Sequence, residues 1–133
     1  MPVPPPAMPA DGNGKLLLLV DDEPSLRETG AKLLDRLGYR VICATDGEHA
    51  LHLFHSRADE LAGVILDLTM PGMDGVETLT QLRRIRPDIP VVVSSGHSEQ
   101  EVQQRFADQN LSGFISKPYS LDGLQHALAD SLP

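Results

Sequence analysis

From Lys15 onward, short apolar runs alternate with longer amphipathic stretches five times along the chain. The runs are apolar on successive residues rather than on every second one, which indicates strands that are buried on both faces. Five such units in series predict an α/β fold: a doubly wound, five-stranded parallel sheet with five helices. The expected strands are Leu16–Val20, Arg40–Ala44, Ala62–Leu66, Pro90–Ser94 and Gly113–Ser116.

The amphipathic stretches predict helices that each turn an apolar face to the sheet. Pro24 suits the opening turn of the first helix, and Gly38 is typical of a residue that ends one. The expected apolar faces comprise Leu26, Leu33, Leu34 and Leu37 in the first helix, Val76, Leu79 and Leu82 in the third, and Leu121, Leu124, Leu128 and Leu132 in the fifth. Capping pairs for the third and fourth helices are expected at Asp74 with Glu77 and at Ser98 with Glu101.

Length and charge exclude several classes of protein. A chain of 133 residues fits one domain with a sizeable core. Its formal net charge of −8, from 19 acidic and 11 basic residues, argues against nucleic-acid binding by this domain. The one cysteine, Cys43, cannot form an internal disulfide and falls in an apolar run, so we expect a small core residue and a cytoplasmic location.

The first 14 residues differ in composition from the rest. They contain five prolines and no sustained apolar stretch, which is typical of a disordered leader or an interdomain linker. The segment lacks the cationic start and apolar centre of a signal peptide. No apolar run in the chain approaches the roughly 20 residues of a membrane span, so we expect no membrane association.

Polar side chains follow the expected strands at the points where these end. Asp21 and Asp22 follow the first strand and Asp67 follows the third, while Ser95 and Lys117 come just past the fourth and fifth. The carboxyl ends of parallel strands meet at one rim of such a sheet, where ligands bind. Two carboxylates ~4 Å apart repel each other by about 4 kcal/mol at an effective dielectric of ~20. A hard divalent cation such as magnesium, calcium or manganese would relieve this repulsion, and the hydroxyl and ammonium groups would suit a phosphoryl group.

These residues, in this order, resemble the receiver domain of two-component response regulators, a CheY-like fold. The resemblance covers essentially the whole region from Lys15 onward and identifies residues 15–133 as one receiver domain. It implies the strand order 2-1-3-4-5. The matching segments are Leu-Val-Asp-Asp-Glu-Pro at 19–24, Leu-Asp-Leu-Thr-Met-Pro-Gly-Met-Asp-Gly at 66–75, Ser95-Gly96 and Lys117-Pro118.

The resemblance implies a role for each residue of the acidic rim. Asp67 would be the phosphoacceptor of a His-Asp phosphorelay, taking its phosphoryl group from a histidine kinase or a histidine phosphotransfer domain. Asp22 would ligate Mg²⁺ directly, Asp21 would complete the pocket, and the carbonyl of Thr69 would be a further ligand. Mn²⁺ could replace Mg²⁺. Thr69 and His97 would flank the path of the hydrolytic water and set the lifetime of the phosphoryl group.

The same resemblance implies a switch beside the phosphoacceptor. Lys117 would bridge to the phosphoryl group, and Ser95 would move toward it. Phe114 would be the aromatic residue whose rotamer follows that hydroxyl, and Pro118 would form a cis peptide that aims the lysine. The output would be a surface of the fourth helix, fifth strand and fifth helix, which would contact a downstream protein or a second copy of the domain. Such a domain would be a signalling phosphoacceptor rather than an enzyme acting on other substrates.

Simpler interpretations exist for single residues. Asp21 and Asp22 could cap the first helix, Asp67 could belong to an Asx turn, and Phe114 could be an ordinary core residue. Three histidines recur every third residue on the second helix, where a solvated face is a better interpretation than a metal site. These are His49, His52 and His55, and His126 on the last helix also fits a surface position.

Other functions fit the motifs less well. A haloacid-dehalogenase-type phosphatase would carry a second aspartate two residues after the nucleophile, and this chain has Thr69 there. A flavin carrier would need a phosphate-binding loop after the first strand, where Asp21 and Asp22 would repel a phosphate. The open alternatives to a free-standing regulator are the receiver module of a hybrid histidine kinase, tethered by the leader, and a pseudo-receiver that only docks.

Overall fold

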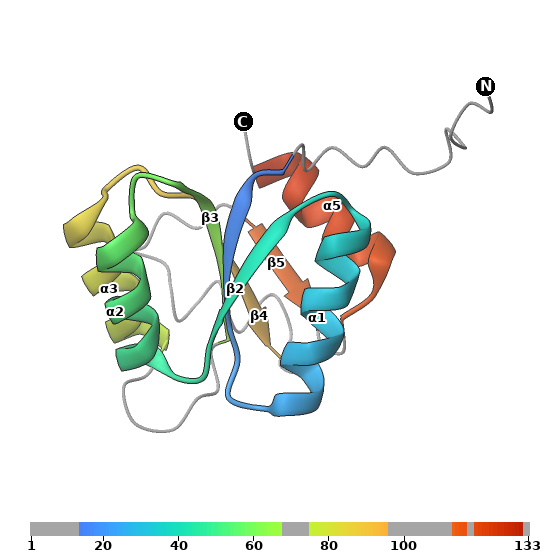
Figure 1. Cartoon of the computed structure of the whole chain (residues 1–133), viewed down its shortest axis with the longest axis horizontal. Coiled ribbons are helices and arrows are strands. Elements are labelled where there is room, and N and C mark those ends of the chain that lie inside the picture. Colours follow the sequence, from blue (N-terminus) through green and yellow to red (C-terminus); the bar gives the residue numbers. More distant parts are fainter. Residues whose placement is uncertain (1–13, 68–74, 96–112, 117–118, 132–133) are drawn as a thin grey trace.

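The structure is a computed structural model that describes residues 14–67, 75–95, 113–116 and 119–131. Strands and helices alternate through these ranges (Figure 1). In chain order the elements are β1 (Leu16–Val20), α1 (Pro24–Arg36), β2 (Arg40–Ala44), α2 (Gly47–Arg57), β3 (Leu61–Asp67), α3 (Gly75–Ile85), β4 (Val91–Ser95), β5 (Gly113–Ser116) and α5 (Leu121–Ser131). The fourth helix and its capping pair, and the leader before Gly14, lie outside the described residues.

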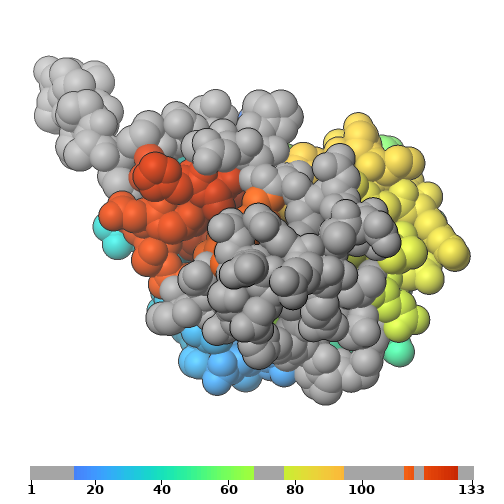
Figure 2. Space-filling view, turned by 180° about the vertical axis from the view of Figure 1, so that it is seen from behind, coloured from blue at the N-terminus to red at the C-terminus, as the bar shows by residue number. Residues whose placement is uncertain are grey.

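The five strands form one parallel sheet in the order β2-β1-β3-β4-β5, which confirms the expected order 2-1-3-4-5. Helices α2 and α3 lie on one side of the sheet, and α1 and α5 lie on the other (Figure 1). Seen from behind, α5 in red and α3 in yellow occupy opposite sides of the molecule (Figure 2). The fold is therefore the three-layered, doubly wound arrangement that the sequence predicts. None of the described helices is long and apolar enough to cross a membrane.

The residues of β1 are all apolar because the strand packs against helices on both faces. Leu16, Leu18 and Val20 join a core cluster with residues of α2 and α3. Leu17 and Leu19 join a second cluster with residues of α1 and α5. Successive side chains of a strand point to opposite faces, so a strand covered by helices on both faces must be apolar at every position. Each fully buried leucine contributes about 1.5–3 kcal/mol relative to an exposed one.

At the positions whose side chains are described, the helices pack through the faces that their spacing predicts. Leu132 and the side chain of Val76 lie outside the described part of the chain. The fully buried positions are Leu34 and Leu37 of the first apolar stretch, Leu79 and Leu82 of α3, and Leu124 and Leu128 of α5. Leu26, Leu33 and Leu121 are half-buried against the α1/α5 cluster. Pro24 occupies the first turn of α1. Gly38 ends the helical segment with φ +93°, a conformation that glycine adopts without steric cost.

The bounds of two strands and the burial of one side chain differ from the sequence expectation. β3 is one residue longer at each end than Ala62–Leu66, because Leu61 pairs with Leu16 and Asp67 pairs with Ser94. β4 runs one residue later than Pro90–Ser94, since proline has no N–H to contribute to the ladder. Cys43 is only half-buried, because β2 is an edge strand of the sheet.

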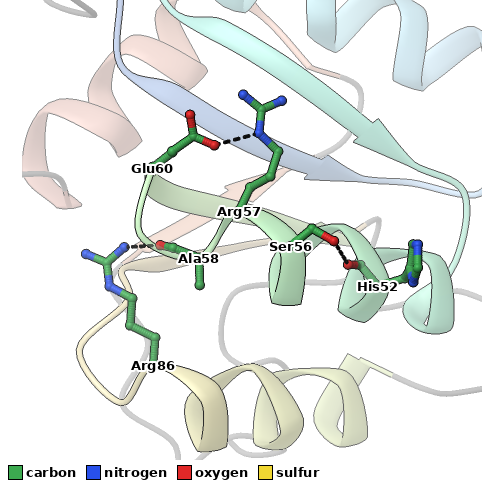
Figure 3. Close-up of polar contacts among 6 residues, drawn as sticks. All are labelled: His52, Ser56, Arg57, Ala58, Glu60 and Arg86. Atoms are coloured by element: carbon green, nitrogen blue, oxygen red, sulfur yellow. Dashed lines mark hydrogen bonds and ion pairs between the residues drawn. The ribbon is translucent and has the colours of Figure 1, made fainter.

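Arg86 links the end of α3 to the connection between α2 and β3. The Nη1 group of Arg86, just after α3, donates hydrogen bonds to the carbonyl oxygens of Ala58 (2.8 Å) and Leu61 (2.5 Å). Figure 3 shows Arg86 reaching the chain that follows α2, beside the exposed ion pair of Arg57 and Glu60. These bonds hold the end of α3 against the connection between α2 and β3.

Candidate functional site

The three aspartates that the sequence places at strand ends converge in the structure. Asp21 directly follows β1, Asp22 is the next residue, and Asp67 is the last residue of β3. One carboxylate oxygen from each lies within 4.8 Å of the other two. Asp21 and Asp67 are completely buried, whereas Asp22 is exposed. The site is thus an acidic pocket in which two carboxylates are buried and the third is exposed to solvent.

Both oxygens of the Asp21 carboxylate accept hydrogen bonds from the protein. The backbone N–H of Glu23 donates to Oδ1 (3.0 Å), and the hydroxyl of Tyr119 donates to Oδ2 (3.0 Å). Arg27 of α1 donates from Nη1 to the backbone carbonyl of Asp21 (2.8 Å). Asp21 is therefore held at its backbone and at each end of its carboxylate. It does not cap α1, whose N-cap residue is Glu23 and has no side-chain capping bond.

A buried serine that pairs with Asp67 in the sheet also contacts Tyr119. Ser94 of β4 is buried, and its register partner on β3 is Asp67. Its hydroxyl lies 3.1 Å from the hydroxyl of Tyr119. Because the single hydroxyl proton of Tyr119 goes to Asp21, Ser94 donates and Tyr119 accepts. A continuous hydrogen-bonded path thus runs from β4 through Tyr119 to the end of β1.

The charges in the pocket influence one another. Desolvation raises the pKa of Asp22 above its ordinary value, and the negative charges of Asp67 and Asp21 raise it further. Burial raises the pKa of Tyr119 strongly, and the charge of Asp21 adds to this. Tyr119 is therefore a neutral hydrogen-bond donor at physiological pH. Three carboxylates therefore lie close together in the pocket.

The donor set of this pocket fits a hard divalent cation. Carboxylate oxygens are the ligands that Mg²⁺, Mn²⁺ and Ca²⁺ prefer, and a cation at this point would neutralise charges that now repel. Within the described residues, these aspartates are the one group of three His, Cys, Asp or Glu side chains close enough to hold a metal. The histidines of α2 are exposed at positions 49, 52 and 55, as the solvated-face interpretation predicts, and His126 is exposed as well.

The other predicted site residues are described less completely. Ser95 ends β4, where its backbone pairs with Ser116, so it lies at the same rim as Asp67. Phe114 is half-buried and packs against the core cluster on the α2/α3 side. The remaining predicted site residues, Thr69, His97, Lys117 and Pro118, lie outside the described residues.

Sequence reasoning missed the residues that hold Asp21. Tyr119 lies two residues past the predicted phosphoryl-binding lysine, and an aromatic hydroxyl so close to a strand end was a usable signal. The apolar pattern identifies Ser94 only as the end of the fourth strand. Arg27 carries no local pattern that distinguishes it from any other basic residue in the first turns of a helix.

Comparisons with known proteins agree with this geometry. A family model described as the response regulator receiver domain matches residues 17–129. The sensor kinase CckA of Brucella abortus is 34% identical over 116 residues, which are 87% of this chain and 12% of the kinase. The chain spans only 12–13% of the length of this kinase and of the sensor histidine kinases RcsC of Salmonella typhi and Salmonella typhimurium, which it also resembles.

Two solved structures share the fold over nearly their whole length. The chemotaxis protein CheY4 of Vibrio cholerae superposes with a TM-score of 0.82 at 26% identity, covering 90% of this chain and 99% of that one. The response regulator TrrA of Thermotoga maritima, solved in complex with Mg(2+)-BeF, has a TM-score of 0.77 at 30% identity, covering 86% and 96%. With its matching family model, its strand order and its acidic pocket, the chain belongs to the response regulator receiver domain family.

Proposed function

We propose that this domain is a phosphoacceptor switch that takes a phosphoryl group from a phosphohistidine onto Asp67. The observation that carries the proposal is the position of Asp67: a completely buried carboxylate at the end of β3, within 4.8 Å of the carboxylates of Asp21 and Asp22. Burying a charge beside like charges is costly unless a cation offsets it, and such arrangements cluster at functional sites. The chain belongs to a family of signalling phosphoacceptors, which supports this role for Asp67.

The transfer is a displacement at phosphorus. An oxygen of the Asp67 carboxylate attacks the phosphorus atom of the donor, and a P–O bond forms as the P–N bond to the donor imidazole breaks. The imidazole nitrogen keeps the electron pair of the broken bond. The product is an acyl phosphate, a covalent intermediate that water can later hydrolyse.

The residues that would hold Mg²⁺ are Asp21, Asp22 and Asp67, with the backbone carbonyl of Thr69. A bound divalent cation supplies positive charge that offsets the carboxylates and the phosphoryl oxygens. A set of three carboxylates fits this ion, with Mn²⁺ as a substitute, and the TrrA structure was solved with Mg(2+)-BeF. This chain's own contribution is to hold Asp21 by two hydrogen bonds and to keep Asp67 away from water.

Further roles extend the same proposal. A cationic side chain and a hydroxyl at the strand ends would bind the phosphoryl oxygens, and an aromatic residue on β5 would respond to the hydroxyl. Side chains near the acyl phosphate would set how quickly it hydrolyses. The residues proposed are Lys117 and Ser95 for binding, Phe114 for the response, Pro118 for a cis peptide that aims the lysine, and Thr69 and His97 for the lifetime.

The partners proposed are a histidine kinase or histidine phosphotransfer domain as donor, and a downstream protein or second copy as receiver of the signal. The output surface would include β5 and α5 together with the helix that precedes β5. A second candidate is that the domain serves inside a hybrid histidine kinase. The similarity to sensor kinases supports this second candidate, since the chain matches a segment that makes up 12–13% of each kinase.

Binding of beryllium fluoride, a mimic of a phosphoryl group, tests the proposal. With Mg²⁺ present, we expect beryllium fluoride to raise the melting temperature of the wild type beyond the rise caused by Mg²⁺ alone. The Asp67→Asn variant should lack this additional rise, because the mimic needs the Asp67 oxygen. An equal additional rise in Asp67→Asn would contradict the assignment.

A further inference from the structure

The hydroxyl of Tyr119 lies beside the proposed phosphotransfer site but has no role in the proposed reaction. It is buried in the wall of the acidic pocket and contacts two polar groups, Asp21 and Ser94. We propose that Tyr119 is a positioning residue: its hydroxyl holds the Asp21 carboxylate in the orientation that the pocket presents to a divalent cation. This inference rests on the proposed function, because it assumes that the pocket binds such a cation.

The geometry at Asp21 carries the first step. Its Oδ1 is fixed by the N–H of Glu23 and its Oδ2 by Tyr119, each at 3.0 Å. A carboxylate held at both oxygens cannot rotate about its terminal torsion, whereas one held at a single oxygen can. The Glu23 bond is local, because the donor lies only two positions after Asp21. The Tyr119 bond depends on tertiary structure, since the two residues are 98 positions apart.

The surroundings of Tyr119 carry the second step, because a positioning group must itself be fixed. The ring is buried within the cluster on the α1/α5 side of the sheet. It approaches α1 so closely at Gly30 that a β-carbon there would lie 3.1 Å from one ring carbon and 3.2 Å from another. Ser94 fixes the hydroxyl rotor by donating to the phenol oxygen, which directs the phenol proton to Asp21.

The third step is the expected effect on metal binding when a hydrogen-bond partner of a metal ligand is removed. Groups that hydrogen-bond to a ligand fix its orientation, and their removal typically weakens metal binding about 10- to 100-fold. Tyr119→Phe removes only the hydroxyl and keeps the ring that packs against Gly30. We therefore expect the dissociation constant for Mg²⁺ to increase by about 10-fold in this variant. Ser94→Ala should cause a smaller increase in the same direction, because the phenol proton loses its fixed direction but not its acceptor.

The experiment measures Mg²⁺ affinity by calorimetry and the tyrosine absorption spectrum with and without Mg²⁺. The chain has two tyrosines and no tryptophan, so changes in aromatic absorption report on tyrosine. Tyr39→Phe is the matched control, since Tyr39 belongs to the same core cluster but precedes β2 at the other edge of the sheet. We expect Mg²⁺ to change the tyrosine spectrum of the wild type and of Tyr39→Phe, and to leave that of Tyr119→Phe unchanged.

The outcomes separate the two proposals. A wild type that does not bind Mg²⁺ overturns the proposed function and this inference with it. A wild type that binds Mg²⁺, with an unchanged dissociation constant in both Tyr119→Phe and Ser94→Ala, overturns this inference alone and makes Tyr119 a purely structural residue. If Tyr119→Phe fails to fold, the decision rests on Ser94→Ala and on the spectrum of Tyr39→Phe: unchanged affinity in the first or no Mg²⁺-induced change in the second overturns the inference.

Discussion

Tyr119 and Asp21 are 98 positions apart in sequence and share a buried hydrogen bond of 3.0 Å. Asp21 follows β1, the second strand in the spatial order, and Tyr119 lies just before α5, after the strand at the far edge of the sheet. The bond therefore joins an acidic residue of the pocket to the start of the last helix. It also shows that the pocket is held by residues outside the recognisable motif.

Removing the charge of Asp22 should stabilise the metal-free domain. Asp22→Asn removes a charge whose desolvation and whose repulsion from Asp67 and Asp21 raise the pKa of Asp22. Because Asp22 is exposed and its charge is screened by solvent, we expect a gain of only about 0.5–1 kcal/mol in the free energy of unfolding. Urea denaturation in the presence of a chelator measures it. With Mg²⁺ the order should reverse, since the variant lacks one carboxylate ligand; a variant that Mg²⁺ stabilises as much as the wild type would contradict this.

The pH dependence of that gain follows from the direction of the pKa shift. The folded protein holds the Asp22 proton more tightly than the unfolded chain does, since the pKa of Asp22 is raised on folding. The stability that the wild type derives from this proton is present below the unfolded pKa of about 3.9 and is lost as pH rises through the folded value. Denaturation of wild type and Asp22→Asn from pH 3 to pH 7 should therefore show a stability difference that grows with pH. A constant difference would contradict the shift.

Arg86 should matter to stability and not to the site. Arg86→Met removes the two hydrogen bonds to the carbonyl oxygens of Ala58 and Leu61, leaving partly buried acceptors without this donor. We expect a loss of about 2 kcal/mol in the free energy of unfolding, measured by urea denaturation. Arg57→Met is the matched control, since it removes an exposed ion pair with Glu60 and should leave the urea midpoint nearly unchanged. Equal losses in the two variants would contradict the assigned role.

Gly30 should not tolerate a larger side chain despite lying in a helix. Alanine is preferred over glycine in helices by about 1 kcal/mol. At this position a β-carbon would lie 3.0 Å from Leu19 Cδ2 and 3.1 Å from the ring of Tyr119, and overpacking of a core typically costs about 1–3 kcal/mol. We expect a net loss of stability in Gly30→Ala, visible as a lower urea midpoint. A midpoint above that of the wild type would show that the ring can yield at no cost.

The features that could be predicted from sequence depend on local pattern. Three strands have the expected bounds, β1, β2 and β5, because continuous apolar runs bounded by polar residues identify strands that are covered on both faces. The convergence of Asp21, Asp22 and Asp67 also follows, since carboxyl ends of parallel strands meet at one rim. Identity and position suffice for such features.

The features that could not be predicted depend on tertiary register. The extension of β3 to Asp67 results from its pairing with Ser94, and the partial exposure of Cys43 results from the edge position of β2. The hydrogen bonds of Tyr119 and Arg86 join segments 25 or more positions apart. The spacing of residues in the sequence does not indicate which distant group the side chain of Tyr119 or Arg86 will contact.

The central claim is that Asp67 accepts a phosphoryl group, and intact-protein mass spectrometry tests it most directly. The domain is incubated with acetyl phosphate and Mg²⁺, with a chelated sample and Asp67→Asn as controls. We expect the mass of the wild type to increase by one phosphoryl group, with no increase in either control. Addition of a phosphoryl group to Asp67→Asn to the same extent as to the wild type would contradict the account.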